Sequence, residues 1–352
     1  MYKYIGNKTK ILDEVLKEIS HYAHAGDTVV DLMSGTGTVA EGMRREGYKV
    51  IASDMMTYSY FHNLVRLNLT SYPEFENLKI STSEKPYQRY MDILSYLNNL
   101  PPCEGYYFNE FSPGGTPQNS DKPRFYFTSE NASKIDSIVN VLNTWRDSGE
   151  ISAIENAVLR HTLILAVNDI ANVSGTYGHY HAKQINKSKD KLFLKDILEI
   201  DLFSDSIKKH VVLQGYAEDL ASKISAKVCY IDPPYTKRQY AANYHVLETI
   251  ARGDFPPAIG ASGLRPWRDQ YSNFNSKLKI RESFRKIILS MNCSIFIISY
   301  SEDGLLTKDE MIALLSEFGH VDFRAFSHKR FKSNDSKLPQ KLDEFLFTLI
   351  RK

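Results

Sequence analysis

The chain contains few cysteines, and their positions argue against two kinds of site. Cys103, Cys229 and Cys293 are the only three among 352 residues. They stand too far apart for zinc-ligand spacing, and their odd number leaves no complete pairing. His179 and His181 lie close together, but no third ligand follows them. We therefore expect no metal, no disulfide framework and a reducing, cytoplasmic setting of the bacterial type.

Long apolar runs and an excess of one charge are also missing. No secretory leader pattern follows Met1, and the longest apolar stretch, near 294–299, is too short to cross a bilayer. We therefore expect no membrane partner. The net charge of +2 does not by itself indicate a nucleic-acid partner. An apolar content of 42% is ample for a core, and the length allows one large domain or two unequal ones.

A glycine-rich loop near the N-terminus predicts a nucleotide-type site. The buried-strand pattern at 28–32 is followed by Gly35 and Gly37 and then by a helical stretch. Glycine lets the backbone turn tightly and approach a ligand. Asp54 ends the next strand, where its carboxylate can accept hydrogen bonds from ribose hydroxyls. The residues around Gly35 and Gly37 also fit the dinucleotide-binding fingerprint G-x-G-x-x-A. A pyrophosphate, however, prefers positive charge and bare amides, so Asp31 favours the cationic S-adenosylmethionine.

The tetrapeptide Asp232-Pro233-Pro234-Tyr235 follows a strand-like run and predicts methylation of an exocyclic amine on a planar ring. Such an amine is a poor nucleophile until acceptors bind its two hydrogens, because its lone pair is delocalised. Ionised Asp232 accepts one hydrogen, and the Pro233 carbonyl can accept the other. Tyr235 offers a flat face for stacking, an interaction of about 1–3 kcal/mol. The alternative is a surface turn, which Pro-Pro after a strand often marks.

Several motifs together resemble the Dam-like N6-adenine DNA methyltransferases, and most closely the FokI-type modification methyltransferases among them. The matching stretches are 4–8, 31–37 with Asp54, 232–235 with its continuation to Glu248, and the blocks 175–178 and 298–304. The resemblance implies a flipped-out adenine in double-stranded DNA as substrate. It also implies a monomeric enzyme of a restriction-modification system, with a restriction endonuclease encoded separately. An RNA adenine methyltransferase, or one acting on another exocyclic amine, is the alternative.

The resemblance also assigns roles to individual residues. Asp232, Pro233 and Tyr235 are the expected catalytic residues. In methyltransferases an acid that contacts the cofactor's adenine often follows this strand. Two acids stand here, and Asp219 is assigned this role in preference to Glu218. The residues expected to bind S-adenosylmethionine are Tyr4, Gly6, Lys8, Asp31, Gly35, Gly37, Asp54 and Asp219.

The order of strand-like and helical runs predicts an α/β fold with a mixed, Rossmann-like methyltransferase sheet. Its strands are expected at 29–32, 50–53, 211–213, 228–231 and 295–298, and the runs 321–326 and 345–350 are expected to close it as an antiparallel hairpin. We expect a catalytic domain formed by 1–70 and 210–352. The inserted, mainly helical region 71–209 is expected to recognise the target, because it interrupts the sheet without adding cofactor or catalytic motifs.

Basic and aromatic residues suggest where DNA binds. Arginines beside aromatic residues in the excursion 254–276 suit phosphate and base contacts. Lysine clusters at 183–195 and 329–341 fit contact with the DNA backbone, although solvated surface loops explain them equally well. The candidate DNA-binding residues are Lys183, Arg238, Tyr240, Arg265, Arg268, Lys329 and Arg330.

Overall fold

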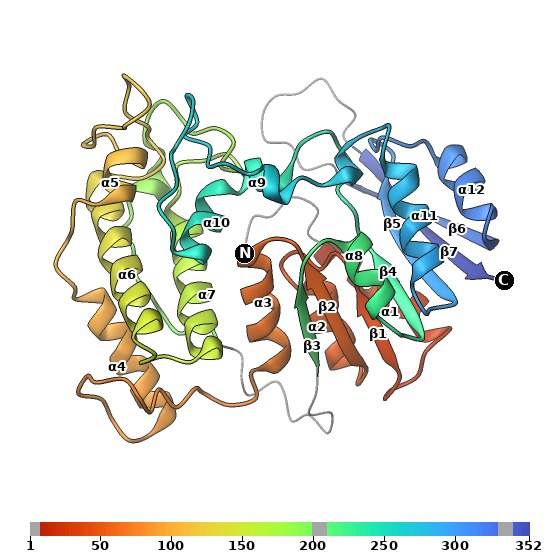
Figure 1. Ribbon diagram of the computed structural model, residues 1–352, viewed down its shortest axis with the longest axis horizontal. Helices are drawn as coiled ribbons and strands as arrows, with labels where there is room; N and C mark the ends of the chain where they lie inside the picture. The colour runs from red at the N-terminus through yellow and green to blue at the C-terminus, as the bar shows by residue number, and fades with distance from the viewer. Residues whose placement is uncertain (1–7, 199–209, 330–340) are drawn as a thin grey trace. The chain divides into compact units, whose positions relative to one another are not determined.

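The computed structural model describes residues 8–198, 210–329 and 341–352, and it divides into two compact units (Figure 1). The sheet unit comprises Gly6–Asn68, Asp205–Gln239 and Gln270–Lys352. The helical unit includes Leu69–Ser204 and Tyr240–Asp269. In the described parts of the chain, no helix is both long and apolar enough to span a membrane.

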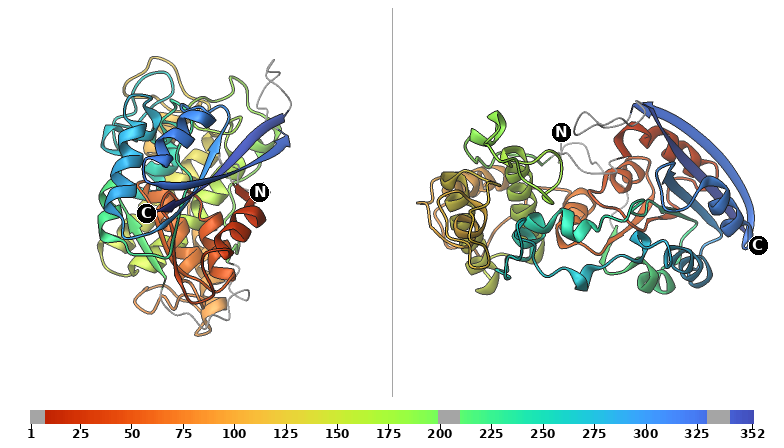
Figure 2. Two further views of the ribbon diagram at one scale, coloured as in Figure 1. Left: turned by 90° about the vertical axis from the view of Figure 1, so that its right-hand side faces the viewer. Right: turned by 90° about the horizontal axis from the view of Figure 1, so that it is seen from above.

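The sheet unit is built on seven strands in the order β3-β2-β1-β4-β5-β7-β6. Strand β7 is antiparallel to both of its neighbours, whereas the other pairs are parallel. The predicted mixed sheet and its closing hairpin are therefore confirmed, and Figure 2 shows the two long hairpin strands side by side. The strands are β1 (Thr28–Asp31), β2 (Lys49–Asp54), β3 (Val211–Gln214), β4 (Val228–Ile231), β5 (Ile295–Ser301), β6 (Gly319–Lys329) and β7 (Lys341–Arg351).

The central strands are buried on both faces, as expected for parallel strands covered by helices. Two successive residues of β5 show this directly, because successive side chains of a strand point to opposite faces. Ile297 packs in a cluster with residues of α1 and α2, and Ile298 packs in a second cluster with residues of α11 and α12. The helices of this unit are α1 (Leu12–Ser20), α2 (Thr38–Arg45), α3 (Thr57–Asn68), α8 (Ala217–Leu220), α11 (Ile280–Ser290) and α12 (Lys308–Ser316), with short 3₁₀ turns η1 (Lys8–Lys10), η4 (Ala221–Lys223) and η6 (Asn273–Asn275).

The helical unit is organised around two long helices, α6 (Ser129–Asp147) and α7 (Ala153–Ile170). Local sequence sets where each begins. The Thr128 side chain caps α6, and Ser152 forms a reciprocal capping box with Glu155 at the start of α7. The remaining helices are α4 (Pro86–Asn98), α5 (Tyr106–Phe111), η2 (Asn186–Lys189), α9 (Tyr240–Asn243) and α10 (His245–Arg252), and η5 (Arg268–Gln270) lies at the end of this unit.

The helical unit also contains Tyr240–Asp269, a stretch that the sequence analysis assigned to the catalytic domain. The physical reason lies in contacts of α10 with α7 and with the loop that follows α7. The buried Arg160 of α7 donates to the Ile250 carbonyl at 2.7 Å, and His245 of α10 contacts the Tyr177 carbonyl at 2.9 Å. Periodicity along the chain does not reveal such long-range packing.

Candidate active site

The glycine loop between β1 and α2 is fixed by one acid, Asp54, and one side-chain amide, Asn63. The Asp54 carboxylate accepts hydrogen bonds from the Gly35 N–H at 2.9 Å and the Met56 N–H at 2.8 Å. Asn63 of α3 donates to the carbonyls of Gly35 and Ser59 at 3.2 and 2.8 Å. Asn63 has no signature in the sequence, because its relation to the loop depends on how α3 packs. Gly35 and Gly37 have φ angles of +50° and +81°, which favour glycine.

Asp31 lies at the end of β1 with its side chain almost wholly enclosed. Its carboxylate accepts a hydrogen bond from the Ala40 N–H of α2 at 3.1 Å. Burial raises the pKa of Asp31 well above its usual range, and the charges of Asp232 and Asp54 add to this effect. A cation brought next to Asp31 would stabilise the ionised carboxylate against burial and against the two neighbouring negative charges. The site therefore suits a positively charged ligand better than a pyrophosphate.

Strands β1 and β4 are parallel neighbours, so their carboxyl ends meet at the same edge of the sheet. In this register Asp31 pairs with Tyr230, two residues before Asp232. The loop 232–235 follows β4 directly. The sheet therefore brings the glycine loop and the Asp-Pro-Pro-Tyr loop together, although about 200 residues separate them in the sequence.

Asp232 is part of a compact hydrogen-bonded cluster. Its side chain is 17% exposed, and its Oδ1 lies 3.0 Å from the Lys8 Nζ. The Tyr235 hydroxyl donates to the same oxygen at 2.5 Å. Lys8 also contacts this hydroxyl, and its ammonium lies 4.6 Å from the centroid of the Tyr235 ring. The Tyr235 ring also packs against Tyr300 of β5 in a T-shaped arrangement, with the two centroids 5.5 Å apart.

Glu344 of β7 completes the cluster, and the sequence analysis did not identify it. Its side chain is 6% exposed, and its Oε1 lies 2.6 Å from the Lys8 Nζ and 2.8 Å from the Tyr235 hydroxyl. The strand register pairs Glu344 with Ser301, the last residue of β5. The available signal was an acid immediately before the apolar run 345–350, which was expected to form one strand of the closing hairpin.

Two carboxylates thus share one lysine. Burial raises the pKa of Asp232 to about 7, with Lys8 opposing the shift and Glu344 reinforcing it. Burial tends to lower the pKa of Lys8, but the charges of Asp232 and Glu344 outweigh burial and raise it. Lys8 therefore stays cationic. Near neutral pH the protonated and the ionised forms of Asp232 are both populated.

A nucleotide-type loop, an acid at the end of β1 and an Asp-Pro-Pro-Tyr loop after β4, all at one sheet edge, fit the family that the sequence matches. The D12 class N6 adenine-specific DNA methyltransferase family matches residues 4–314. The chain belongs to this family. The resemblance inferred from the motifs is thereby confirmed.

Individual relatives agree with this methyltransferase assignment. The type II methyltransferase M.FokI of Planomicrobium okeanokoites is 34% identical over 98% of this chain and 52% of its own length. The modification methylase StsI of Streptococcus sanguinis is 30% identical over 99% of this chain and 52% of its own length. The chain therefore spans about half the length of these two relatives. The type II methyltransferase M.CviAII of Paramecium bursaria Chlorella virus 1 is 32% identical over 98% of this chain and 97% of its own length.

The other residues expected to bind the methyl donor lie in different surroundings. Tyr4 and Gly6 are outside the described residues. Asp219 is exposed and pairs with Lys286 at 2.7 Å. Its neighbour Glu218 is buried and accepts a hydrogen bond from the Ser283 hydroxyl at 2.7 Å. The assignment of Asp219 to the cofactor's adenine stays a prediction.

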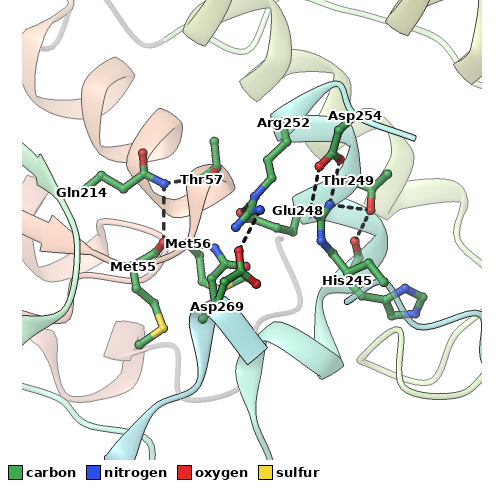
Figure 3. Close-up of polar contacts among 12 residues, drawn as sticks. Met55, Met56, Thr57, Gln214, His245, Glu248, Thr249, Arg252, Asp254 and Asp269 are labelled. Atoms are coloured by element: carbon green, nitrogen blue, oxygen red, sulfur yellow. Dashed lines mark hydrogen bonds and ion pairs between the residues drawn. The ribbon is translucent and has the colours of Figure 1, made fainter. Parts of the chain in front are cut away.

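Arg265 differs from the other residues predicted to bind DNA, because it is buried. It makes two contacts with the Asp254 carboxylate, at 2.9 and 2.7 Å, and donates to the Thr249 hydroxyl at 3.0 Å. These contacts fix the loop after α10 and give no support to a DNA contact by Arg265. In the same unit, Arg252 binds Glu248 at 2.8 Å and Asp269 at 3.1 Å (Figure 3).

The remaining candidates for DNA contact are mostly at the surface. Lys183, Arg238 and Arg268 are exposed, and Tyr240 is half-buried. The Arg238 backbone is held by Asn275, whose side-chain amide donates to its carbonyl at 3.0 Å. Arg330 and the side chain of Lys329 lie outside the described residues. The DNA contacts of all these residues stay predictions.

One further polar contact supports the cofactor side of the sheet edge. Gln214, the last residue of β3, donates to the Thr57 hydroxyl at 2.9 Å and to the Met55 carbonyl at 3.5 Å (Figure 3). It thereby holds the turn that follows Asp54. Among the described residues, no group of three or more His, Cys, Asp or Glu side chains is arranged to hold a metal ion.

Proposed function

We propose that the chain transfers a methyl group from S-adenosylmethionine to N6 of an adenine flipped out of double-stranded DNA. The observation that carries this proposal is the position of Asp232, at the end of β4 beside the glycine loop and in contact with Tyr235. Membership of the D12 class supports adenine as the base and DNA as the substrate. The named relatives support a role as the modification enzyme of a restriction-modification system.

The described residues fit S-adenosylmethionine. Asp31 supplies a buried negative charge for a cationic ligand, and the glycine loop makes its tight turn through the positive φ angles of Gly35 and Gly37. Asp54 stands where a ribose would be bound, with its carboxylate already orienting the loop. When bound, the donor supplies an electrophilic methyl group on a sulfonium.

The protein's contribution to the transfer is to hold and polarise the amine. The Tyr235 ring stacks on the extruded adenine, whose release from the duplex costs a few kcal/mol. Asp232 accepts one N6 hydrogen and the Pro233 carbonyl accepts the other, which restores electron density to the nitrogen. No strong base is needed beforehand, because the amine proton becomes acidic only after the methyl group is attached. Positioning and electrostatics account for most of the rate.

We further propose that the helical unit selects the target sequence, because it supplies neither the glycine loop nor the catalytic loop. The enzyme acts as a monomer, with its restriction endonuclease on a separate chain. Exchanging Leu69–Ser204 for the corresponding stretch of a relative tests the first point. A changed methylated sequence is expected, and an unchanged one would assign specificity elsewhere.

Sequencing of modified bases in DNA from cells that express this chain tests the main proposal. N6-methyladenine is expected within one short sequence context, and it should be absent from cells that express Asp232→Ala. Methyl groups on cytosine would contradict the assignment. Methyl groups found only in RNA would favour the RNA adenine alternative.

A further inference from the structure

We propose that Glu344 is a positioning residue, which holds Lys8 and Tyr235 so that Asp232 presents a free oxygen to the amine of the substrate. This inference rests on the proposed function. It concerns a residue outside all of the sequence motifs, on the antiparallel strand that closes the sheet.

The two carboxylate oxygens of Asp232 differ in their hydrogen bonds. Lys8 and the Tyr235 hydroxyl both bind Oδ1. Among the described residues, no group donates to Oδ2. This oxygen is not fully buried, so solvent reaches it. The second oxygen is therefore available to an N6 hydrogen while the first stays fixed.

Glu344 contacts the same two groups, and the Tyr235 hydroxyl, which has one hydrogen, donates it to one of the two carboxylates at a time. The Glu344 Oε1 lies 2.6 Å from the Lys8 Nζ and 2.8 Å from the Tyr235 hydroxyl. Without this acceptor, the Lys8 ammonium would have Asp232 as its only described carboxylate partner and could occupy both oxygens. With it, the positive charge is shared and Asp232 remains an effective acceptor.

The position of Glu344 in the sheet argues against a purely structural role. Burying a carboxylate costs free energy that an apolar side chain would not cost. The strand continues as Phe345–Ile350, and most of these residues are buried. An apolar residue at 344 would serve the sheet at least as well, so the acid is explained by what it does to Lys8, Tyr235 and Asp232.

The charge of Glu344 also sets the pH at which Asp232 can act. The groups that face Asp232 are Lys8, Tyr235, Glu344 and, across the sheet edge, Asp31. Glu344→Gln keeps an oxygen acceptor of the same reach but removes one negative charge. Asp232 should then lose its proton at a pH lower by about one pH unit. Lys8 should also bind Asp232 more tightly.

Single-turnover transfer of labelled methyl groups to unmethylated genomic DNA, from about pH 5 to about pH 9, tests the inference. Glu344→Gln should move the acid limb of the profile to lower pH and reduce the plateau rate about tenfold, with DNA affinity unchanged. Glu344→Asp keeps the charge, so its acid limb should stay near that of the wild type.

Thr348→Val is the matched control on the same strand. Thr348 is buried and donates to the Glu18 carboxylate at 2.8 Å, with no contact to the cluster. It should change stability without moving the pH profile. If Glu344→Gln slows transfer but leaves the acid limb in place, as a merely structural loss would, the inference is wrong.

A second measurement does not depend on activity. Carbon-13 NMR of the aspartate carboxyl groups, with the Asp232 signal assigned from Asp232→Asn, follows its titration without DNA. A lower titration point in Glu344→Gln supports the coupling, and an identical one overturns it. If the wild type fails to methylate adenine while this coupling is present, the proposed function fails and the contact network stands.

Discussion

Gly37→Ala probes the cofactor loop, and Gly26 provides an internal reference. Both glycines have positive φ angles, +81° and +93°, so alanine meets a similar backbone penalty of about 1–2 kcal/mol at each. The surroundings differ. A Cβ at Gly37 would lie 2.8 Å from the Asn63 Oδ1 and 3.0 Å from the Arg66 Cδ, whereas a Cβ at Gly26 meets nothing within 4 Å.

The additional cost at Gly37 follows from how Asn63 is held. Its amide donates to the Gly35 and Ser59 carbonyls, so it cannot move aside without loss of hydrogen bonds worth about 0.5–1.5 kcal/mol each. We expect Gly37→Ala to lower the free energy of unfolding by roughly 2–4 kcal/mol, and Gly26→Ala by about 1–2 kcal/mol. Only Gly37→Ala should weaken S-adenosylmethionine binding.

Urea unfolding and calorimetry with S-adenosylmethionine measure the two quantities. A double-mutant cycle with Asn63→Ala isolates the clash, because removing the Asn63 amide should cost less in the Gly37→Ala background than in the wild type. Equal losses of stability for the two glycine variants, with equal donor affinity, would refute the steric argument and with it the close packing of α3 on the loop.

Three further predictions concern the catalytic loop. Asp232→Ala should reduce single-turnover methyl transfer by about 10²–10³ and leave DNA affinity nearly unchanged; near-normal transfer would contradict the role of this carboxylate. Tyr235→Phe should retain base capture, since stacking needs only the ring, but it removes a hydroxyl that contacts Asp232 and Glu344, so transfer should fall about tenfold, and a loss of DNA binding would be inconsistent. Because the pKa of Asp232 is raised to about 7, its carboxyl takes up a proton as the pH falls below that value and stops acting as an ionised acceptor; rates measured against pH should decline on the acid side, and a flat profile would contradict this.

Local patterns were sufficient to predict much of the fold. The apolar runs that became β1, β4 and β5 are flanked by polar turns, and the two late runs pair as the expected hairpin. The motifs also placed Asp31, Asp54 and Asp232 at strand ends, where a doubly wound sheet gathers its ligands.

What the sequence did not reveal depends on contacts between distant segments. Glu344 and Lys8 are 336 residues apart, and their contact requires β7 to pair with β5 in one particular register. Arg265 was predicted to bind DNA, yet it is buried and contacts Asp254 and Thr249; these partners lie near it in the sequence, but only the fold of the loop after α10 shows the burial. Neither fact has a periodic or compositional signature, because each arises from packing rather than from local propensity.

The position of the insertion also affects how the protein reaches its native state during synthesis. Ile51 of β2 pairs with Val211 of β3, 160 residues later. The separation in sequence between β1 and β4 is larger still. At ribosomal speeds of about 5–20 residues per second, the first strands emerge roughly 8–40 s before their partners. Throughout that interval β1 and β2 expose unpaired strand edges, which can aggregate. Early folding of the intervening helices would reduce the entropy lost when β3 and β4 pair with these strands, because a folded insertion leaves a shorter flexible loop to close. Chaperone demand should therefore peak while residues 69–210 are being translated.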